Sequence, residues 1–133
     1  MPQGGTDFIF GEKIMPSPLQ DKSKAFALEI IKVCNEMKHS KRESVLTNQL
    51  IRSGTSIGAN IREAMYAHGK ADFIAKLQIA LKECSESEYW LELLIESGYY
   101  DDPTILKQCT EVKRLPEKIM KSRPEAIWTA LNL

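Results

Sequence analysis

Apolar residues recur every three or four positions in four successive stretches of the chain. This spacing keeps them on one face of an α-helix and predicts an amphipathic helix in each stretch. The predicted helices span about residues 18–38, 43–68, 70–97 and 103–122. Because short connections make long helices antiparallel neighbours, the pattern predicts an all-α, antiparallel up-and-down four-helix bundle over residues 17–123.

Turn and capping residues separate the predicted helices. Ser40 and Glu43 have the spacing of a capping box, which predicts the start of the second helix. Gly69 separates the second helix from the third, and Gly98 follows the third as a C-terminal cap. Asp102 precedes the fourth helix at its N-terminal cap.

The two ends of the chain and the fourth helix depart from this regular pattern. Residues 1–16 are rich in Gly and Pro and predict a flexible arm, although the Phe-Ile-Phe triplet at 8–10 leaves open a segment that docks on a neighbouring surface. Pro116 removes a backbone donor inside the fourth helix and predicts a kink or a break. Residues 124–133, around Trp128, predict either a frayed tail or a short docking helix. No segment has a strand pattern.

Two glycines, Gly54 and Gly58, lie one turn apart inside the second helix. Each glycine disfavours a helix interior by roughly 1 kcal/mol relative to alanine. Because the apolar period continues through both without a change of phase, we expect a second helix to pack closely against this strip. The alternative is a weak helix or a break at the two glycines.

The third helix is apolar on two sides. Phe73 and Leu91 belong to the face that is expected to line the core, whereas Ile79, Trp90 and Leu93 fall roughly opposite at about 100° per residue. A helix of an isolated bundle buries one stripe and exposes the rest to solvent. A second stripe that contains a tryptophan predicts a second partner, so we expect these three residues to form an oligomer interface.

Polar residues lie among the packing faces of the second and third helices. They are Arg52, Asn60, Arg62, Glu63, Glu83 and Glu88. Glu88 falls close to the core stripe, where a carboxylate needs a partner, and we expect Arg52 or Arg62 to supply it. Two interpretations stay open: a network that fixes helix register or subunit pairing, and a polar functional site.

The charge balance argues against a dedicated nucleic-acid binder. Lys and Arg number 18, as do Asp and Glu, so the formal net charge is zero, whereas such binders are usually basic. The fourth helix is nevertheless locally basic, and it is where weak phosphate contact is expected. Its candidate residues are Lys113, Arg114, Lys118 and Lys121. A solvated charged face is the alternative explanation.

Patterns of catalysis and metal binding are missing from the sequence. Its two histidines lie outside any HxxxH arrangement, its three cysteines lack CxxC spacing, and no GxSxG elbow or P-loop is found. We therefore expect no enzymatic activity, no cofactor or metal and no small-molecule substrate. The sequence also lacks a signal peptide and any apolar run of about 20 residues, which predicts a cytoplasmic protein without membrane contact.

A family resemblance rests on the second and third predicted helices. Its motifs are RSGTSIGANIREA at 52–64, Asp72-Phe73, IALKEC at 79–84 and YWLELL at 89–94. Together they resemble the small four-helix-bundle proteins encoded within intervening sequences of bacterial 23S rRNA genes. The resemblance implies an up-and-down bundle that assembles into a ring-like homopentamer and has no established enzymatic activity.

Two functions follow from this resemblance as expectations. The first is a non-enzymatic, self-assembling bundle that serves as a scaffold or associates weakly with RNA. The second is a nucleic-acid-binding accessory factor, similar to the accessory proteins of diversity-generating retroelements, which share the fold, are basic and associate with a reverse transcriptase. The neutral charge of this chain departs from that second branch.

Overall fold

The computed structural model describes residues 8–9, 12–13 and 16–132, and helices dominate this part of the chain. The helices are α1 (Pro16–Ser40), α2 (Val45–Met65), α3 (Lys70–Glu96), α4 (Thr104–Lys121) and α5 (Pro124–Leu131). Two strands of two residues each, β1 (Phe8–Ile9) and β2 (Glu12–Lys13), pair in antiparallel register, which the sequence pattern does not predict. Of the N-terminal arm expected over residues 1–16, residue 16 belongs to α1, and residues 1–7, 10–11 and 14–15 lie outside the described residues.

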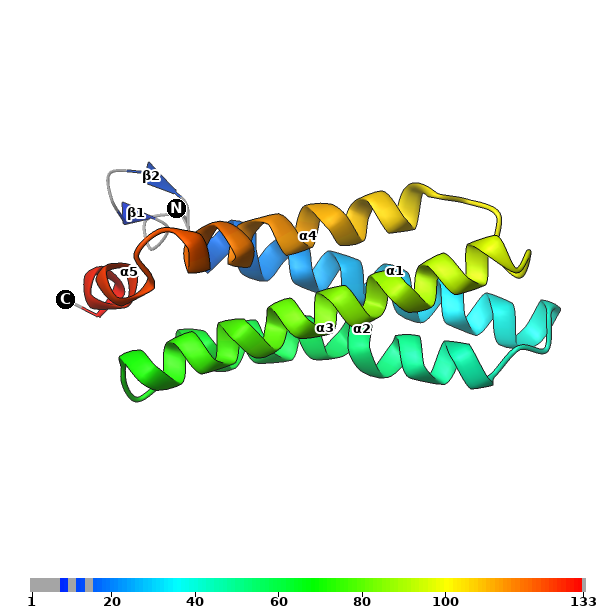
Figure 1. Cartoon of the computed structure of the whole chain (residues 1–133), viewed down its shortest axis with the longest axis horizontal. Coiled ribbons are helices and arrows are strands. Elements are labelled where there is room, and N and C mark those ends of the chain that lie inside the picture. Colours follow the sequence, from blue (N-terminus) through cyan, green and yellow to red (C-terminus); the bar gives the residue numbers. More distant parts are fainter. Residues whose placement is uncertain (1–7, 10–11, 14–15, 133) are drawn as a thin grey trace.

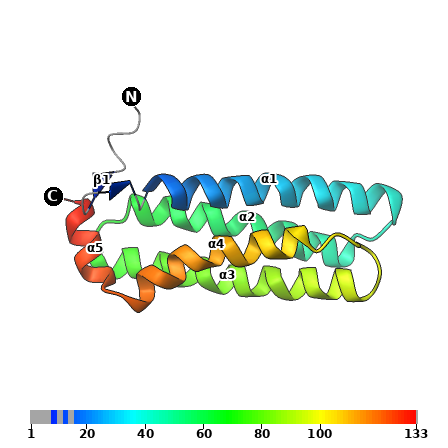
Figure 2. The ribbon, with the colours of Figure 1, turned by 90° about the horizontal axis from the view of Figure 1, so that it is seen from above.

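The four long helices α1 to α4 lie side by side along the long axis of the molecule (Figure 1). The chain reverses direction at each of the connections between them, as Figure 1 shows. Helices α1 and α3 each contact both α2 and α4, so every long helix has two neighbours along its length. This is the square arrangement of a four-helix bundle. Figure 2 shows α5 lying across the end of the bundle at which α1 begins.

The core lies between the four long helices and is built from their predicted apolar faces. Its large, fully buried side chains include Phe26, Ile30, Leu50, Ile57, Ile61, Phe73, Leu77, Leu91 and Leu94. Helix α4 adds Ile105, Cys109, Val112 and Ile119. Full burial of a side chain of this size contributes about 1.5–3 kcal/mol, so the core accounts for the main stabilising term of the fold.

The start of α2 differs from the predicted capping box. Ser40 instead ends α1, where its hydroxyl donates to a backbone carbonyl one turn earlier. The carboxylate of Glu43 accepts hydrogen bonds from the backbone amides of Leu46 and Thr47, each at 2.9 Å. These bonds satisfy two amides that the first turn of a helix leaves without partners. Helix α2 therefore begins at Val45, and Glu43 rather than Ser40 supplies its cap.

Local backbone chemistry defines the turn between α3 and α4. Gly98 adopts a φ of +86° directly after the last turn of α3, a conformation that glycine adopts without strain. The backbone amides of Tyr99 and Tyr100 both donate to the carbonyl of Leu94, which completes the C-terminal cap. The carboxylate of Asp102 then accepts from the first amide of α4 at 3.0 Å.

The break predicted at Pro116 is wrong, because α4 runs through this residue without interruption. The proline is buried on the inner face of α4, and the helix continues although the ring removes one backbone hydrogen bond. Residues 124–131 form α5, in which Ile127, Trp128 and Leu131 pack half-buried against the core. The end of the chain is thus a short docking helix and not a frayed tail.

Candidate interaction surfaces

The two glycines of α2 lie against α1, with different consequences. A Cβ atom added to Gly54 would lie 3.1 Å from two side-chain carbons of Ile30, closer than ordinary contact. A Cβ atom added to Gly58 would lie 3.4 Å from the hydroxyl oxygen of Ser23, an ordinary separation. Gly54 therefore marks a close helix approach within the chain, whereas Gly58 borders an open groove.

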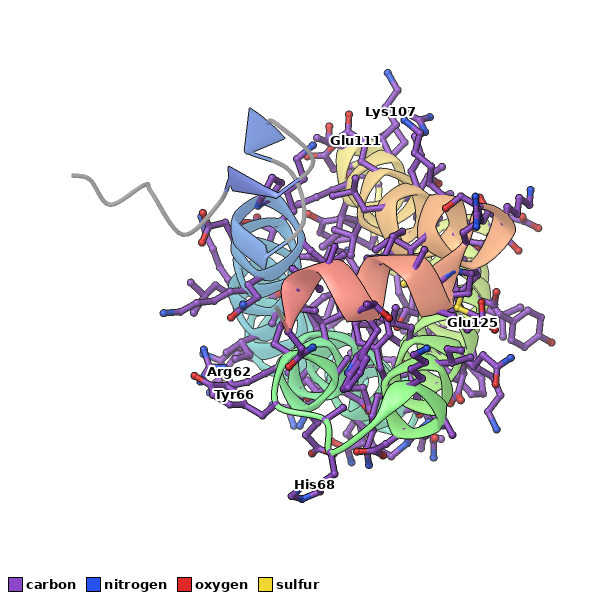
Figure 3. The ribbon with its side chains drawn as sticks, turned by 90° about the vertical axis from the view of Figure 1, so that its left-hand side faces the viewer. Arg62, Tyr66, His68, Lys107, Glu111 and Glu125 are labelled. Carbon is purple, nitrogen blue, oxygen red and sulfur yellow. The ribbon has the colours of Figure 1, made fainter. Side chains whose placement is uncertain are left out.

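This groove, of about 470 Å³, lies along the outside of α1 and α2. Small residues from both helices line it, among them Ala27, Gly58 and Ala59. Lys24 and Arg62 are the cations beside it, and neither makes an ion pair within the described residues. In Figure 3, Arg62 projects from the flank on which α1 and α2 adjoin. We call this surface the groove flank.

On the neighbouring flank, Arg52 of α2 reaches two carboxylates of α3. Its guanidinium lies 3.4 Å from Glu83 and is hydrogen-bonded to Glu86. Glu86 also accepts a hydrogen bond from the indole nitrogen of Trp90 at 3.0 Å. The hydrogen bond from Arg52, followed by that from Trp90, holds the pKa of Glu86 below its ordinary value. The same contact raises the pKa of Arg52.

The three residues expected to form an oligomer interface lie along this second flank of α3. Ile79 falls in register between Lys76 and Glu83, which both pair with α2. Ile79 is 37% exposed, and Trp90 and Leu93 are half-buried. We call the surface around Ile79, Trp90 and Leu93 the Trp90 flank. It lies beside α2, so the two apolar faces of α3 are not diametrically opposite.

The expected polar network is divided into separate groups in the structure. Glu63 pairs with Lys76 of α3 at 2.9 Å and raises the pKa of that lysine. The amide of Asn60 donates to the carbonyl and hydroxyl oxygens of Ser56 within α2. Arg62 is exposed and belongs to none of these groups. The six residues therefore do not converge on one polar site.

Glu88 pairs with α4, so the expected arginine partner from α2 is wrong. The ammonium group of Lys113 lies 3.1 Å from one oxygen of Glu88, and the hydroxyl of Thr110 donates to the other at 3.2 Å. The hydrogen bond to Glu88 raises the pKa of Lys113. Glu88 and Lys113 thus join α3 to α4, and this lysine is engaged within the fold.

One polar contact was missed by the sequence reasoning. The hydroxyl oxygens of Ser53 on α2 and Ser87 on α3 lie 2.8 Å apart, and both residues are fully buried. Each serine falls on the apolar face of its helix, and this position is the signal that indicates a buried pair. The hydrogen bond satisfies both hydroxyls and fixes the register of α2 against α3.

The outer surface of α4 is polar. Arg114, Lys118 and Lys121 are exposed and make no ion pair in the part of the chain that the structure describes. Figure 3 shows Lys107 and Glu111 pointing outward from the same helix. This surface can therefore contact solvent or an anionic ligand.

The exposed large apolar residues lie away from α4. Within residues 18–132 they are Leu28, Ile31, Val45, Tyr66, Ile79, Tyr89 and Tyr99. They belong to α1, α2, α3 and the turns that follow α2 and α3, and none lies on α4 or α5. Exposed apolar residues that gather in a patch mark interaction sites, so the first three helices and the turns after them are the candidate contact surfaces.

Reactive groups are not gathered in a cleft. The three cysteines are unpaired and buried, and burial raises the pKa of Cys34 and Cys84 to about 12 and that of Cys109 in the same direction. Such thiols are poor nucleophiles. Among the described residues no group of three potential metal ligands is found, and no described helix is long and apolar enough to cross a membrane.

These features define a class of protein: a small all-α helical bundle. The model of the 23S rRNA-intervening sequence protein family matches residues 18–121, and the chain belongs to this family. A solved structure from Bacteroides thetaiotaomicron VPI-5482, a protein of unknown function from the S23 ribosomal protein family, shares 47% sequence identity and a TM-score of 0.76. The match covers 78% of this chain and 99% of that one. No curated protein matches the chain.

Proposed function

We propose that this chain is a non-enzymatic, self-assembling protein. In this proposal an antiparallel up-and-down bundle forms a homopentamer in the cytoplasm, which acts as a scaffold or associates weakly with RNA. The observation that carries the proposal is the placement of the exposed large apolar residues on α1 to α3 and the turns after α2 and α3, away from the polar α4. The number of five subunits rests on the family resemblance, and the proposal includes no cofactor, membrane or small-molecule substrate.

The exposure of individual side chains supports association. Tyr66 is 79% exposed, Leu28 59% and Ile31 47%, although each is large and apolar. Leu28 and Ile31 are three residues apart and share one face of α1, and large apolar patches on a soluble protein mark interaction sites. The Trp90 flank adds a tryptophan and, beside it, Tyr89, whose ring lies 5.4 Å from that of Trp90. Aromatic residues of this kind supply much of the binding energy at protein interfaces.

The molar mass of the intact chain in solution tests the proposal. Sedimentation velocity and light scattering after size exclusion are expected to give a particle of five chains of 15.1 kDa each. The particle is expected to dissociate on dilution into folded or partly folded single chains. A chain that stays monomeric over the whole concentration range, from micromolar to millimolar, would contradict it.

A second candidate function, a nucleic-acid accessory factor, is favoured by one observation. Arg114, Lys118 and Lys121 form an exposed cationic row on α4 without ion pairs in the described chain. Binding to RNA and to duplex DNA at salt concentrations between about 50 and 200 mM tests it, because each phosphate contact contributes a slope near −0.9 for duplex DNA and near −0.7 for single strands.

The charge-neutralised variant provides the control for that measurement. Replacing Arg114, Lys118 and Lys121 together by glutamine is expected to reduce the salt slope by about 2–3 if all three contact phosphates. An unchanged slope would exclude α4 as the nucleic-acid surface, and an absence of binding at the lowest salt concentration would exclude this second function.

A further inference from the structure

We propose that the groove flank of one copy of this chain receives the Trp90 flank of a second copy. The inference rests on the proposed self-assembly and specifies which surfaces meet. The contact joins two different surfaces, so it is head-to-tail. Its occupant is a second copy because the two complementary surfaces lie on different flanks of one bundle, where a chain cannot cover its own groove.

The two surfaces are complementary in shape. The groove of about 470 Å³ is lined by small residues and is open to solvent. The Trp90 flank presents larger apolar side chains, of which Ile79 is 37% exposed and Trp90 is half-buried. A Cβ atom added to Gly58 would meet only ordinary contacts, so packing within the chain does not require glycine at this position. The missing side chain leaves the groove open instead.

The two surfaces also carry complementary charge. Lys24 and Arg62 border the groove and have no ion pair in the described chain, whereas Glu63, a carboxylate that also lines the groove, is already paired with Lys76 of α3. On the Trp90 flank, Glu83 and Glu86 share the single guanidinium of Arg52, which contacts one oxygen of each carboxylate. Each carboxylate has a second oxygen that can accept a further hydrogen bond. Donors across the interface are thus matched by acceptors, which fixes the orientation of the two copies.

Lys82 does not cancel this match. It lies near enough to lower the pKa of Glu86 electrostatically, but it forms no ion pair there. The hydrogen bonds of Glu86 go to Arg52 and to the indole of Trp90. The carboxylate is therefore held beside the apolar residues that would enter the groove.

The positions of the two flanks favour a small closed ring. Helix α2 contacts α1 on one side and α3 on the other, so the groove flank and the Trp90 flank are adjacent sides of a square bundle. Adjacent sides of a square face directions roughly 90° apart, and a head-to-tail contact that turns each copy by about this angle closes after about four or five copies. A contact between identical flanks would close after two.

Two variants, each altered on one flank, test the inference. Gly58→Gln fills the groove while replacing a helix-breaking residue with a better helix former, so the bundle is expected to fold. Ile79→Lys places a cation where it would face Lys24 and Arg62, at a side chain that is already 37% exposed. Each variant alone is expected to be monomeric in sedimentation velocity, with a circular dichroism spectrum and melting behaviour like those of a folded bundle.

An equimolar mixture of the two variants gives the decisive result. The Gly58→Gln copy has an intact Trp90 flank and the Ile79→Lys copy has an intact groove flank, so the mixture is expected to form a heterodimer and no ring. A mixture that remains monomeric, or single variants that still assemble, would overturn the inference while leaving the assembly of the parent chain in place. A monomeric parent chain would instead overturn the proposed function. The control Lys107→Gln, on the outward side of α4, is expected to assemble as the parent does.

Discussion

One absent side chain determines how closely α1 approaches α2. The space beside Gly54 is filled by Ile30, which is fully buried. Gly54→Leu is expected to lower the free energy of unfolding by about 1–3 kcal/mol, because the added atoms overfill a packed contact. Gly58→Ala is the matched control, and it is expected to leave that energy unchanged or raise it by up to about 1 kcal/mol. Urea unfolding measures both, and equal stability of the two variants would contradict the close contact at Gly54.

The carboxylate of Glu86 makes stability depend on pH in the acid range. Its folded-state pKa lies below its ordinary value of 4.5, chiefly through the hydrogen bond from Arg52. The contact therefore stabilises the fold above about pH 4.5 and is lost as the pH falls through the lowered pKa. Because the pair is partly exposed, Glu86→Gln is expected to destabilise by only about 0.2–1 kcal/mol at pH 7.

The pH series supplies the check on this prediction. The difference in unfolding free energy between the parent and Glu86→Gln is expected to shrink between pH 5 and about pH 3. Glu92→Gln, which removes an exposed carboxylate of the same helix that has no ion pair in the described chain, controls for net charge. A difference that stays constant with pH would show that Glu86 acts through packing and not through its charge.

At the scale of the helices, the positive φ of Gly98 at the end of α3 can be tested by a single substitution. Gly98 has a φ of +86° and no neighbouring atom within 4 Å of an added Cβ atom, so only backbone strain opposes a substitution. Gly98→Ala is expected to destabilise by about 1–2 kcal/mol. Gly69 is the control, since its backbone is extended and its surroundings are equally open. Thermal unfolding that shows equal losses for Gly69→Ala and Gly98→Ala would contradict the strain argument.

The pattern of the sequence predicts the helices well because each one buries a periodic apolar face. Features that depend on contacts between helices are harder to predict from the sequence. The cap of α2 is supplied by Glu43 rather than Ser40, since α1 continues to Ser40 and α2 begins only at Val45. Pro116 interrupts nothing, because its ring is buried against neighbours that the sequence does not specify.

The candidate site shows the same division between local and tertiary information. Glu88 lies near the core stripe by periodicity alone, yet its partner depends on the rotation of α3 relative to α4, and that partner is Lys113. The stripe of Ile79 and Trp90 is visible in the sequence, but its position beside α2 emerges only from the ion pairs across the two helices. The groove is invisible to any single helix, since both α1 and α2 form it.

For the whole molecule, substitutions of the two tryptophans are expected to affect different properties, assembly for one and folding stability for the other. Trp90 of α3 and Trp128 of α5 are both partly buried against the core, but Trp90 also belongs to the Trp90 flank, whereas α5 lies across the end of the bundle (Figure 2). Trp90→Ala is expected to weaken the oligomer by at least tenfold in dissociation constant, as the loss of an aromatic interface residue does. Trp128→Ala is expected to lower the free energy of unfolding by about 1–2 kcal/mol while leaving the oligomer intact.

Sedimentation velocity and thermal unfolding of both variants distinguish these roles. An unchanged oligomer with a lowered melting temperature for Trp90→Ala would place this residue in the core alone. A dissociated oligomer for Trp128→Ala would place α5 in the subunit contact instead.

Helix α4 ends at the end of the bundle where α1 begins, and α5 lies across that end (Figure 2). A tag or cargo attached after α5 is therefore carried at one rim of any ring whose copies share an orientation. The opposite rim carries the turns between α1 and α2 and between α3 and α4, and it stays clear of such fusions. Fusions made after α5 would therefore lie on only one side of such a ring.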